Sequence, residues 1–188
     1  LNNVSYLKKC FLKSYALNNW IEENIKTEAS DLLFYTYWFD EWATILSILS
    51  KKRLIKEYVS KVHGFDLYEF RRKSNKIPFR NFQLRYVSKL FFISKDGRDY
   101  FKKKYPKFHK KYFISYLGTK DYNFPKYIPN KNLTILTISR IDANKQLNLL
   151  IEILQRVSIG ITWIHFGDGP MRAEFLKKSL LLPDNITL

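Results

Sequence analysis

The chain has 188 residues, 46% of them hydrophobic, and a formal net charge of +16. This apolar content excludes a disordered chain, and the length suffices for one good core or two small ones. A single cysteine, Cys10, excludes an internal disulfide and fits a reducing compartment. No apolar run approaches the roughly 18 residues of a membrane span, and no signal peptide is present. We therefore expect a cytoplasmic protein.

The excess of Lys and Arg favours an anionic partner, such as nucleic acid, anionic lipid or a phosphorylated substrate. A general bias of the chain towards Lys, Asn, Ile, Tyr and Phe would explain the charge equally well. The densest basic run is 102–111, where Tyr105 and Phe108 alternate with lysines. This pattern predicts contact with an anionic surface at the inner face of a membrane. Aromatic residues among lysines also stack on RNA bases, but no RNA-binding signature accompanies them here.

The first 120 residues alternate between helical and strand patterns. This alternation is typical of an α/β protein with a doubly wound parallel sheet. Turn-forming residues then concentrate in 121–132, which we interpret as a linker between two domains. The expected domains are thus 1–120 and 133–188. Helices are expected at 4–25, 40–49, 80–87 and 96–105, and strands at 32–38, 58–62, 90–93 and 112–116.

A βαβ unit opens the second domain. An apolar run at 133–138 predicts a strand, apolar residues spaced by three and four at 147–157 predict a helix, and 161–166 predicts a second strand. Asp142 and Asn144 offer helix-start chemistry before the helix. The second strand ends in Gly167-Asp168-Gly169-Pro170, with Pro170 suited to the first position of another helix.

The ends of these strands carry the candidate chemistry. Ligands bind outside the carboxyl ends of parallel strands, beside helix N-termini that attract anions. Arg140 follows the first strand and Lys145 lies at the start of the helix, while Gly167 and Gly169 would let the backbone approach a ligand closely. Together they predict a site for a diphosphate. The alternative is that Arg140 and Lys145 are solvated charges in a lysine-rich chain.

The segments SRIDANKQLNLLIEIL and WIHFGDGP resemble the opening of the second domain of GT-B glycosyltransferases, in the family 4-like group (glycosyl transferases group 1) that builds bacterial surface polysaccharides. In that family an arginine and a lysine at the positions of Arg140 and Lys145 bind the donor diphosphate. The GDGP-like turn lies near the nucleotide. The resemblance implies a fold of two Rossmann-like domains and a donor-binding role for these residues.

The first domain carries further family-like segments: VHGFDLYEFR, IPFR, LFFISKDGRDYF and SYLGT. His63 falls where family members place a histidine that faces the donor sugar, so the resemblance implies a catalytic role. A lone histidine is also often structural. Ser94, Gly118 and Arg80 are weaker candidates for the acceptor side of the cleft. Asp66 and Glu69 invite a general-base role, but carboxylates at a helix start more often cap the helix.

The chain also departs from the family pattern. A pair of glutamates that holds the donor's sugar and ribose in the family has no counterpart before Leu188, and the glycine-bearing first strand has none after Leu1. We therefore expect an incomplete chain with a truncated second domain. Such a chain would be the middle part of a longer enzyme.

The resemblance implies transfer of a sugar from a nucleotide-diphosphate donor to a saccharide or lipid-linked acceptor, with retention of configuration and no other cofactor. No Asp-x-Asp pair is present to hold a divalent ion against the diphosphate, so we predict metal independence. Two alternatives stay open at this point. One is a basic nucleic-acid-binding protein, and the other is a non-catalytic remnant of a glycosyltransferase.

Overall fold

The computed structural model describes residues 3–25, 31–72, 74–121 and 133–188. The chain forms two compact units, unit 1 (Leu1–Lys120) and unit 2 (Asp121–Leu188), each of which is described by itself. The predicted linker lies, except for Asp121, outside the described residues. Among the described residues no helix is long and apolar enough to cross a membrane.

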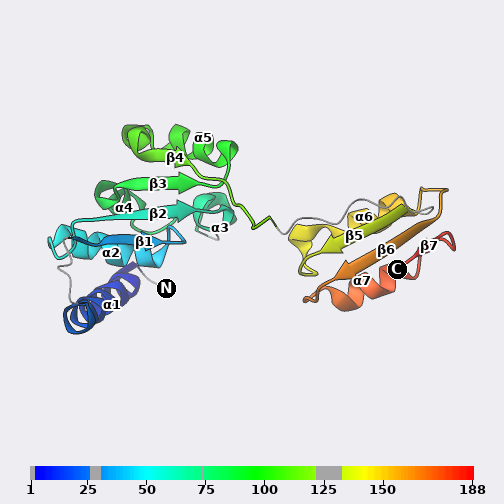
Figure 1. Ribbon diagram of the computed structural model, residues 1–188, viewed down its shortest axis with the longest axis horizontal. Coiled ribbons are helices and arrows are strands. Elements are labelled where there is room, and N and C mark those ends of the chain that lie inside the picture. The colour runs from blue at the N-terminus through cyan, green and yellow to red at the C-terminus, as the bar shows by residue number, and fades with distance from the viewer. Residues whose placement is uncertain (1–2, 26–30, 73, 122–132) are drawn as a thin grey trace. The chain divides into compact units, whose positions relative to one another are not determined.

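Unit 1 is built on a four-stranded parallel sheet (Figure 1). Its strand order is β1-β2-β3-β4, and helices connect the strands, as parallel pairing requires. The eight predicted elements are all present, with ends shifted by at most two residues. The strands are β1 (Leu33–Thr36), β2 (Glu57–Val62), β3 (Lys89–Phe92) and β4 (Tyr112–Ile114). The helical segments are α1 (Asn3–Asn24), α2 (Glu41–Lys51), α3 (Gly64–Leu67), η2 (Glu69–Arg71), α4 (Arg80–Tyr86), α5 (Lys95–Lys104) and η3 (Pro106–Lys111).

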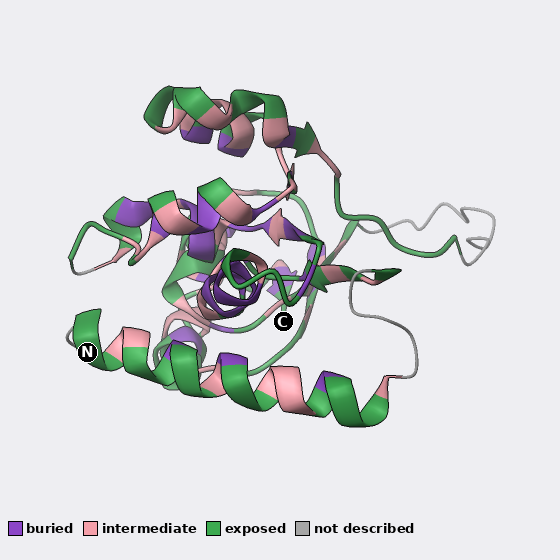
Figure 2. Cartoon of the chain, turned by 90° about the vertical axis from the view of Figure 1, so that its left-hand side faces the viewer, coloured by how far each residue is buried: buried purple, intermediate pink, exposed green. Residues whose placement is uncertain are grey.

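The core of unit 1 lies on one face of this sheet. Alternate strand residues such as Tyr58, Leu90 and Phe92 pack there against side chains of α2, α4 and α5. α1 packs outside α2, and in Figure 2 the helix that starts at the N-terminus shows buried residues along one side only. The opposite face of the sheet presents exposed side chains of Leu33, Tyr35 and Phe113. Burial therefore follows the period-two alternation of the strands.

The basic run 102–111 has its aromatic rings turned inward. Tyr105 and Phe108 pack against the core, so they do not accompany the lysines at the surface as the sequence suggested. Lys104 pairs with Glu69 at 2.8 Å. Lys111 donates from Nζ to the carbonyls of Leu84, Arg85 and Val87, which satisfies the C-terminal end of α4. Burial lowers the pKa of Lys111. Several of these charges thus serve the fold itself.

Unit 2 holds a three-stranded parallel sheet in the order β5-β6-β7. The helix predicted from Asp142 is divided into two. Asp142 caps only the short η4 by accepting the N–H of Asn144 at 3.0 Å, and Gln146, with φ 51°, breaks the chain before α6 begins. The last helix starts at Arg172, two residues later than the predicted Pro170. The elements are β5 (Leu133–Ile138), η4 (Ala143–Lys145), α6 (Leu147–Leu154), β6 (Ile161–Phe166), α7 (Arg172–Ser179) and β7 (Ile186–Thr187).

The core of unit 2 also lies on one face of its sheet. Trp163 and Ile161 of β6 pack there against Leu147, Ile151 and Phe175. The opposite face carries exposed apolar side chains in two cross-strand pairs, because the register sets Leu136 beside Ile164 and Ile138 beside Phe166. The predicted α/β class with parallel sheets is confirmed. In each unit, the described helices that line the core pack against one face of the sheet.

Candidate active site

His63 lies directly after β2, at the carboxyl edge of the first sheet. It is 6% exposed, and its ring packs 4.5 Å from the ring of Tyr37 and 4.4 Å from that of Trp38. Neither ring nitrogen has a hydrogen-bond partner among the described residues. Burial, and then the charge of Lys61, lowers the pKa of His63, so the imidazole is neutral at pH 7. A neutral imidazole has one donor and one acceptor nitrogen, and here both are buried.

Asp66 holds the backbone around His63. Its carboxylate accepts the N–H of His63 at 2.6 Å and the N–H of Phe39 at 2.5 Å, which joins the ends of β1 and β2. Asp66 is fully buried, and desolvation raises its pKa to about 6, against the lowering effect of those two N–H donors and of Arg80. The carboxylate is therefore a positioning group, as the capping interpretation predicted, and not a free base.

We expect Asp66 to make unit 1 less stable as the pH rises. Its folded pKa of about 6 lies above the roughly 3.9 of an unfolded aspartate, so the folded state binds the proton more tightly. The resulting stabilisation is present below about pH 4 and is lost as the pH rises through about 6. In urea unfolding, the wild type should lose stability across this pH range, and Asp66→Asn should not. The control Asp96→Asn, at an exposed carboxylate, should show the same pH dependence as the wild type. A change of the opposite sign would contradict the raised pKa.

A pocket of about 250 Å³ opens beside the ends of β2 and β3, and Gly64, Arg71 and Ser94 contribute to its wall. Ser94 caps α5 by accepting the N–H of Gly97 at 3.1 Å. A Cβ on Gly97 would lie 2.9 Å from the side chains of both Leu67 and Ser94, so one of them would have to shift to admit it. Ser94 thus borders a pocket at the predicted sheet edge, and its hydroxyl oxygen already accepts the hydrogen bond that caps α5.

Arg80 has a structural place. It is 3% exposed, and its guanidinium donates to the carbonyls of Phe39 (2.8 Å) and Asp66 (2.5 Å) and to the side chain of Gln83 (2.9 Å). Burial lowers its pKa to about 10, so it keeps its charge at pH 7. The sequence suggested that Arg80 faces an acceptor or water. The structure corrects this in part: the two terminal nitrogens donate to internal acceptors, whereas Nε is buried without a partner among the described residues, and the side chain also borders the pocket beside α4.

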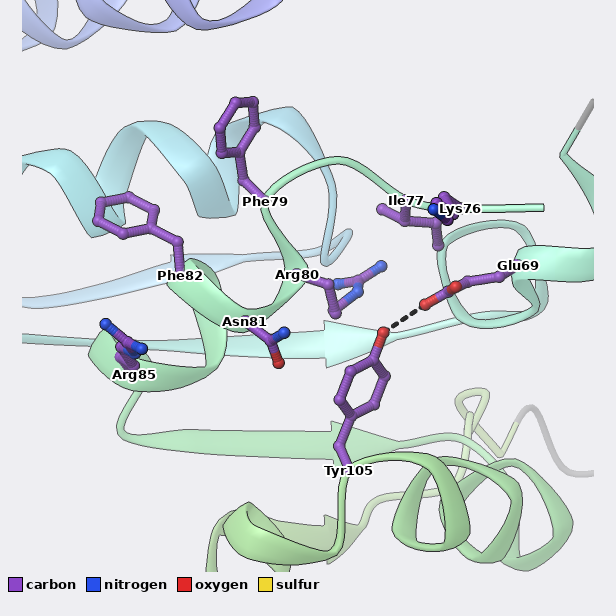
Figure 3. A pocket seen from close by; sticks show the side chains of 9 residues that line it. All are labelled: Glu69, Lys76, Ile77, Phe79, Arg80, Asn81, Phe82, Arg85 and Tyr105. Atoms are coloured by element: carbon purple, nitrogen blue, oxygen red, sulfur yellow. Dashed lines mark hydrogen bonds between the residues drawn. The ribbon is translucent and has the colours of Figure 1, made fainter. Parts of the chain in front are cut away.

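A larger pocket, of about 520 Å³, lies beside α4 (Figure 3). Glu69 and Tyr105, which are hydrogen-bonded to each other, form one wall. Lys76 and Arg85 are exposed basic residues of the same lining.

Gly118, the remaining acceptor-side candidate, is exposed after β4, with no atom within 4 Å of a Cβ placed on it. Of the residues predicted for unit 1, the structure brings His63 and Ser94 to the ends of neighbouring strands.

Arg140 and Lys145 flank a short loop at the carboxyl edge of the second sheet. Arg140 follows β5 and is 69% exposed at its side chain, 3.8 Å from the carboxylate of Asp142. Lys145 ends η4 and is also exposed. Between them Ile141 is buried, which anchors the loop to the core and leaves both cations at the surface. Two exposed cationic side chains at the edge of a parallel sheet can bind an anion, and the exposed Arg140–Asp142 pair contributes little to stability.

Gly167 and Gly169 are needed by the chain itself. A Cβ on Gly167 would lie 1.9 Å from the carbonyl oxygen of Ser139, and one on Gly169 would lie 2.2 Å from that of Ile141. The turn hydrogen-bonds to the loop, from Ser139 N–H to Phe166 O at 3.0 Å and from Ile141 N–H to Asp168 O at 3.0 Å. The glycines therefore let the turn approach residues 139–141 of the same chain. These contacts hold the backbone of Arg140 in place.

For three residues at these two edges, the sequence pattern predicts a place in a strand but no role in a site. Tyr37 and Trp38 were assigned to a strand, but β1 ends at Thr36 and both rings cover His63 beyond it. His165 was taken as a strand residue only. Its Nδ1 is 2.8 Å from the hydroxyl of Thr137, and its Nε2 is buried without a partner among the described residues. The aromatic pair directly after Thr36, at the end of the predicted strand, was the available signal for the first two.

The described residues contain no group of three or more His, Cys, Asp and Glu side chains placed to hold a metal ion. Metal independence stays a prediction.

We give names to the two groups of candidate residues described above. The unit 1 edge is His63, Tyr37, Trp38 and Ser94, and the unit 2 edge is Arg140, Lys145, Gly167 and Gly169.

Comparison with known proteins gives matches among structures alone. No protein-family model matches the chain, and no curated protein gives a significant match. The crystal structure of a mutant of S. aureus TarM, in complex with fondaparinux, alpha-GlcNAc-glycerol and UDP, superposes with a TM-score of 0.58 at 13% identity, over 86% of this chain and 32% of TarM. UDP-N-acetylglucosamine 2-epimerase from Rickettsia bellii gives a TM-score of 0.46 at 18% identity, over 95% of this chain and 50% of the epimerase.

The similarity to TarM establishes the fold. The chain has a GT-B glycosyltransferase-like fold, as the resemblance implied, and it spans about a third of the length of TarM.

Proposed function

We propose that the chain is part of a glycosyltransferase that moves a sugar from a nucleotide-diphosphate donor to an acceptor hydroxyl. The observation that carries this proposal is the pair of exposed cations, Arg140 and Lys145, at the carboxyl edge of a parallel sheet in a GT-B-like fold. In such sheets ligands bind at this edge. The UDP in the TarM complex makes UDP the first nucleotide to test.

The proposed chemistry follows from the charge of the leaving group. When the bond from the sugar to the diphosphate breaks, negative charge grows on the departing phosphate oxygen and must be stabilised there. Arg140 offers a planar fork of N–H donors and Lys145 a point charge, so both can act without a metal. The Gly167 turn holds the backbone under Arg140 in place. Retention of configuration is part of the proposal through the family resemblance.

The unit 1 edge would serve the sugar and the acceptor. His63 is neutral and its two buried ring nitrogens have no partner within the described residues, so it can hydrogen-bond the donor sugar as donor or acceptor once the Tyr37 and Trp38 rings move off it. Trp38 is 41% exposed beside it and offers an apolar ring on which a saccharide can pack. Ser94 and Arg71 add polar groups at the neighbouring pocket. These groups suit a saccharide or lipid-linked acceptor in the synthesis of bacterial surface polysaccharide or glycolipid.

We expect Arg140→Ala and Lys145→Ala each to weaken UDP binding by at least tenfold, because each removes a charge-assisted bond to phosphate worth about 1.5–3 kcal/mol. Isothermal titration calorimetry with UDP, and then with GDP, measures this directly. Arg156→Ala is the matched control, since it removes an exposed cation of unit 2 that follows α6 at its other end. Its UDP affinity should equal that of the wild type.

Three outcomes would count against the proposal. If UDP and GDP fail to bind while RNA binds with an affinity that falls steeply with salt, the chain is a nucleic-acid-binding protein. If neither binds, the chain folds like a glycosyltransferase without nucleotide recognition of its own. Equal losses for Arg156→Ala and Arg140→Ala would show unspecific attraction to a basic surface.

A further inference from the structure

A third pocket in unit 1 combines apolar walls with two lysines. It measures about 340 Å³ and lies where α1, the C-terminal end of α2 and the start of α4 meet. This volume falls within the roughly 300–1,000 Å³ of small-molecule sites. In Figure 3 the rings of Phe79 and Phe82 point to one side of α4, and Tyr105 lies on the other. The lining consists of Leu7, Phe11, Ile48, Phe79 and Phe82, together with Lys51 and Lys52.

The apolar walls of this pocket are held in place. Ile48 is buried and belongs to the small core cluster of Cys10 and Ile45, against which Phe82 also packs. Phe79 adopts a left-handed backbone conformation, with φ 57°, which is unfavourable for a bulky residue. The ring of Tyr6 stacks on Phe79 with the centroids 5.8 Å apart and the planes 9° from parallel. Such strain persists where surrounding contacts enforce it and often marks a ligand site.

The only charged side chains in this lining are two cations. Lys51 and Lys52 are both exposed, and the ammonium of Lys52 lies 6.0 Å from the ring centre of Phe11. Arg53 follows them directly in the chain. A neutral apolar molecule would gain nothing from these cations, and a free phosphate would gain nothing from the five apolar side chains. The lining is complementary to a molecule with one alkyl chain and an anionic head.

We propose that this pocket binds a single anionic lipid, with its alkyl chain against Phe11, Ile48 and Phe82 and its phosphate between Lys51 and Lys52. The site lies at the opposite end of α2 from Glu41 and uses none of the residues assigned to sugar transfer. The proposal therefore goes beyond the transferase function and does not depend on it.

Dodecyl phosphate, kept below its micelle concentration, is the probe for a calorimetric titration of the full chain. We expect Phe11→Ala to weaken its binding about tenfold through lost apolar contact, and the double variant Lys51→Ala, Lys52→Ala to weaken it at least as much. Dodecanol and dodecyltrimethylammonium should bind more weakly than dodecyl phosphate, and inorganic phosphate should not bind.

Two variants control for position. Leu12→Ala removes an exposed apolar side chain next to Phe11 on α1 that is not part of the lining, and Lys8→Ala removes an exposed cation of the same helix. Both should bind like the wild type. Equal loss in the controls, equal affinity for the cationic and anionic amphiphiles, or binding only to vesicles of anionic phospholipid would overturn the pocket proposal. The UDP titration decides the transferase function separately.

Discussion

Gly167→Ala should unfold or strongly destabilise unit 2. The new Cβ would lie 1.9 Å from the carbonyl oxygen of Ser139, and the φ of 150° at this position is one that side-chain-bearing residues rarely adopt. The clash is with backbone, so no side-chain rotation relieves it. We expect a loss of about 4 kcal/mol, in the exceptional range for a single substitution. UDP binding should fall with it, because the same contact holds the loop that carries Arg140.

Hydrogen exchange measured peptide by peptide checks this result. Peptides from β5, β6 and α7 should lose protection in Gly167→Ala, whereas peptides from β2 and β3 should keep it. Gly160→Ala is the matched control in the same unit, since a Cβ at Gly160 meets no atom within 4 Å. Unchanged protection in Gly167→Ala would mean that the turn does not pack against residues 139–141 as described.

The secondary structure of this chain could be predicted from local patterns because burial follows them. Leu90 and Phe92 alternate with residues of the outer face, and Leu147, Ile151 and Leu154 recur at helical spacing. These periodicities depend only on nearby residues, so they hold without knowledge of partners. The boundaries failed where a backbone feature intervened, as at Gln146, whose left-handed φ separates η4 from α6. The spacing of apolar residues along the chain does not reveal such a break.

The roles of the polar residues were harder to predict, because they depend on distant partners. The sequence suggests Arg80 as a weak candidate for the acceptor side, yet its acceptors include the carbonyl of Phe39, 41 positions earlier in the chain. Gly167 and Gly169 were predicted to let the backbone approach a ligand; the close approach in the structure is to Ser139 and Ile141, which sequence spacing cannot distinguish from a ligand. The positions of Arg140 and Lys145 at a sheet edge did follow from pattern, and their donor-binding role stays a proposal.

Arg80→Ala should cost unit 1 about 3–5 kcal/mol, the range for breaking a buried charge network by removing one partner. The substitution leaves the carbonyls of Phe39 and Asp66 without their donor and leaves the buried Asp66 carboxylate without its nearby cation. It also removes the guanidinium that packs 4.3 Å from the ring of Phe39. Urea unfolding, combined with hydrogen exchange of peptides from β1, β2 and α4, measures the loss.

Two further variants separate the causes. Arg80→Lys keeps the charge but replaces the planar fork, whose two terminal nitrogens serve three acceptors, by a single nitrogen, so it should recover only part of the stability. Arg85→Ala removes an exposed arginine from the same helix and should change stability by no more than about 0.5 kcal/mol. If Arg80→Ala were as mild as Arg85→Ala, then Arg80 would not be the cation that joins the ends of β1 and β2 to α4. Its side chain would then be free to serve the acceptor side, as the sequence first suggested.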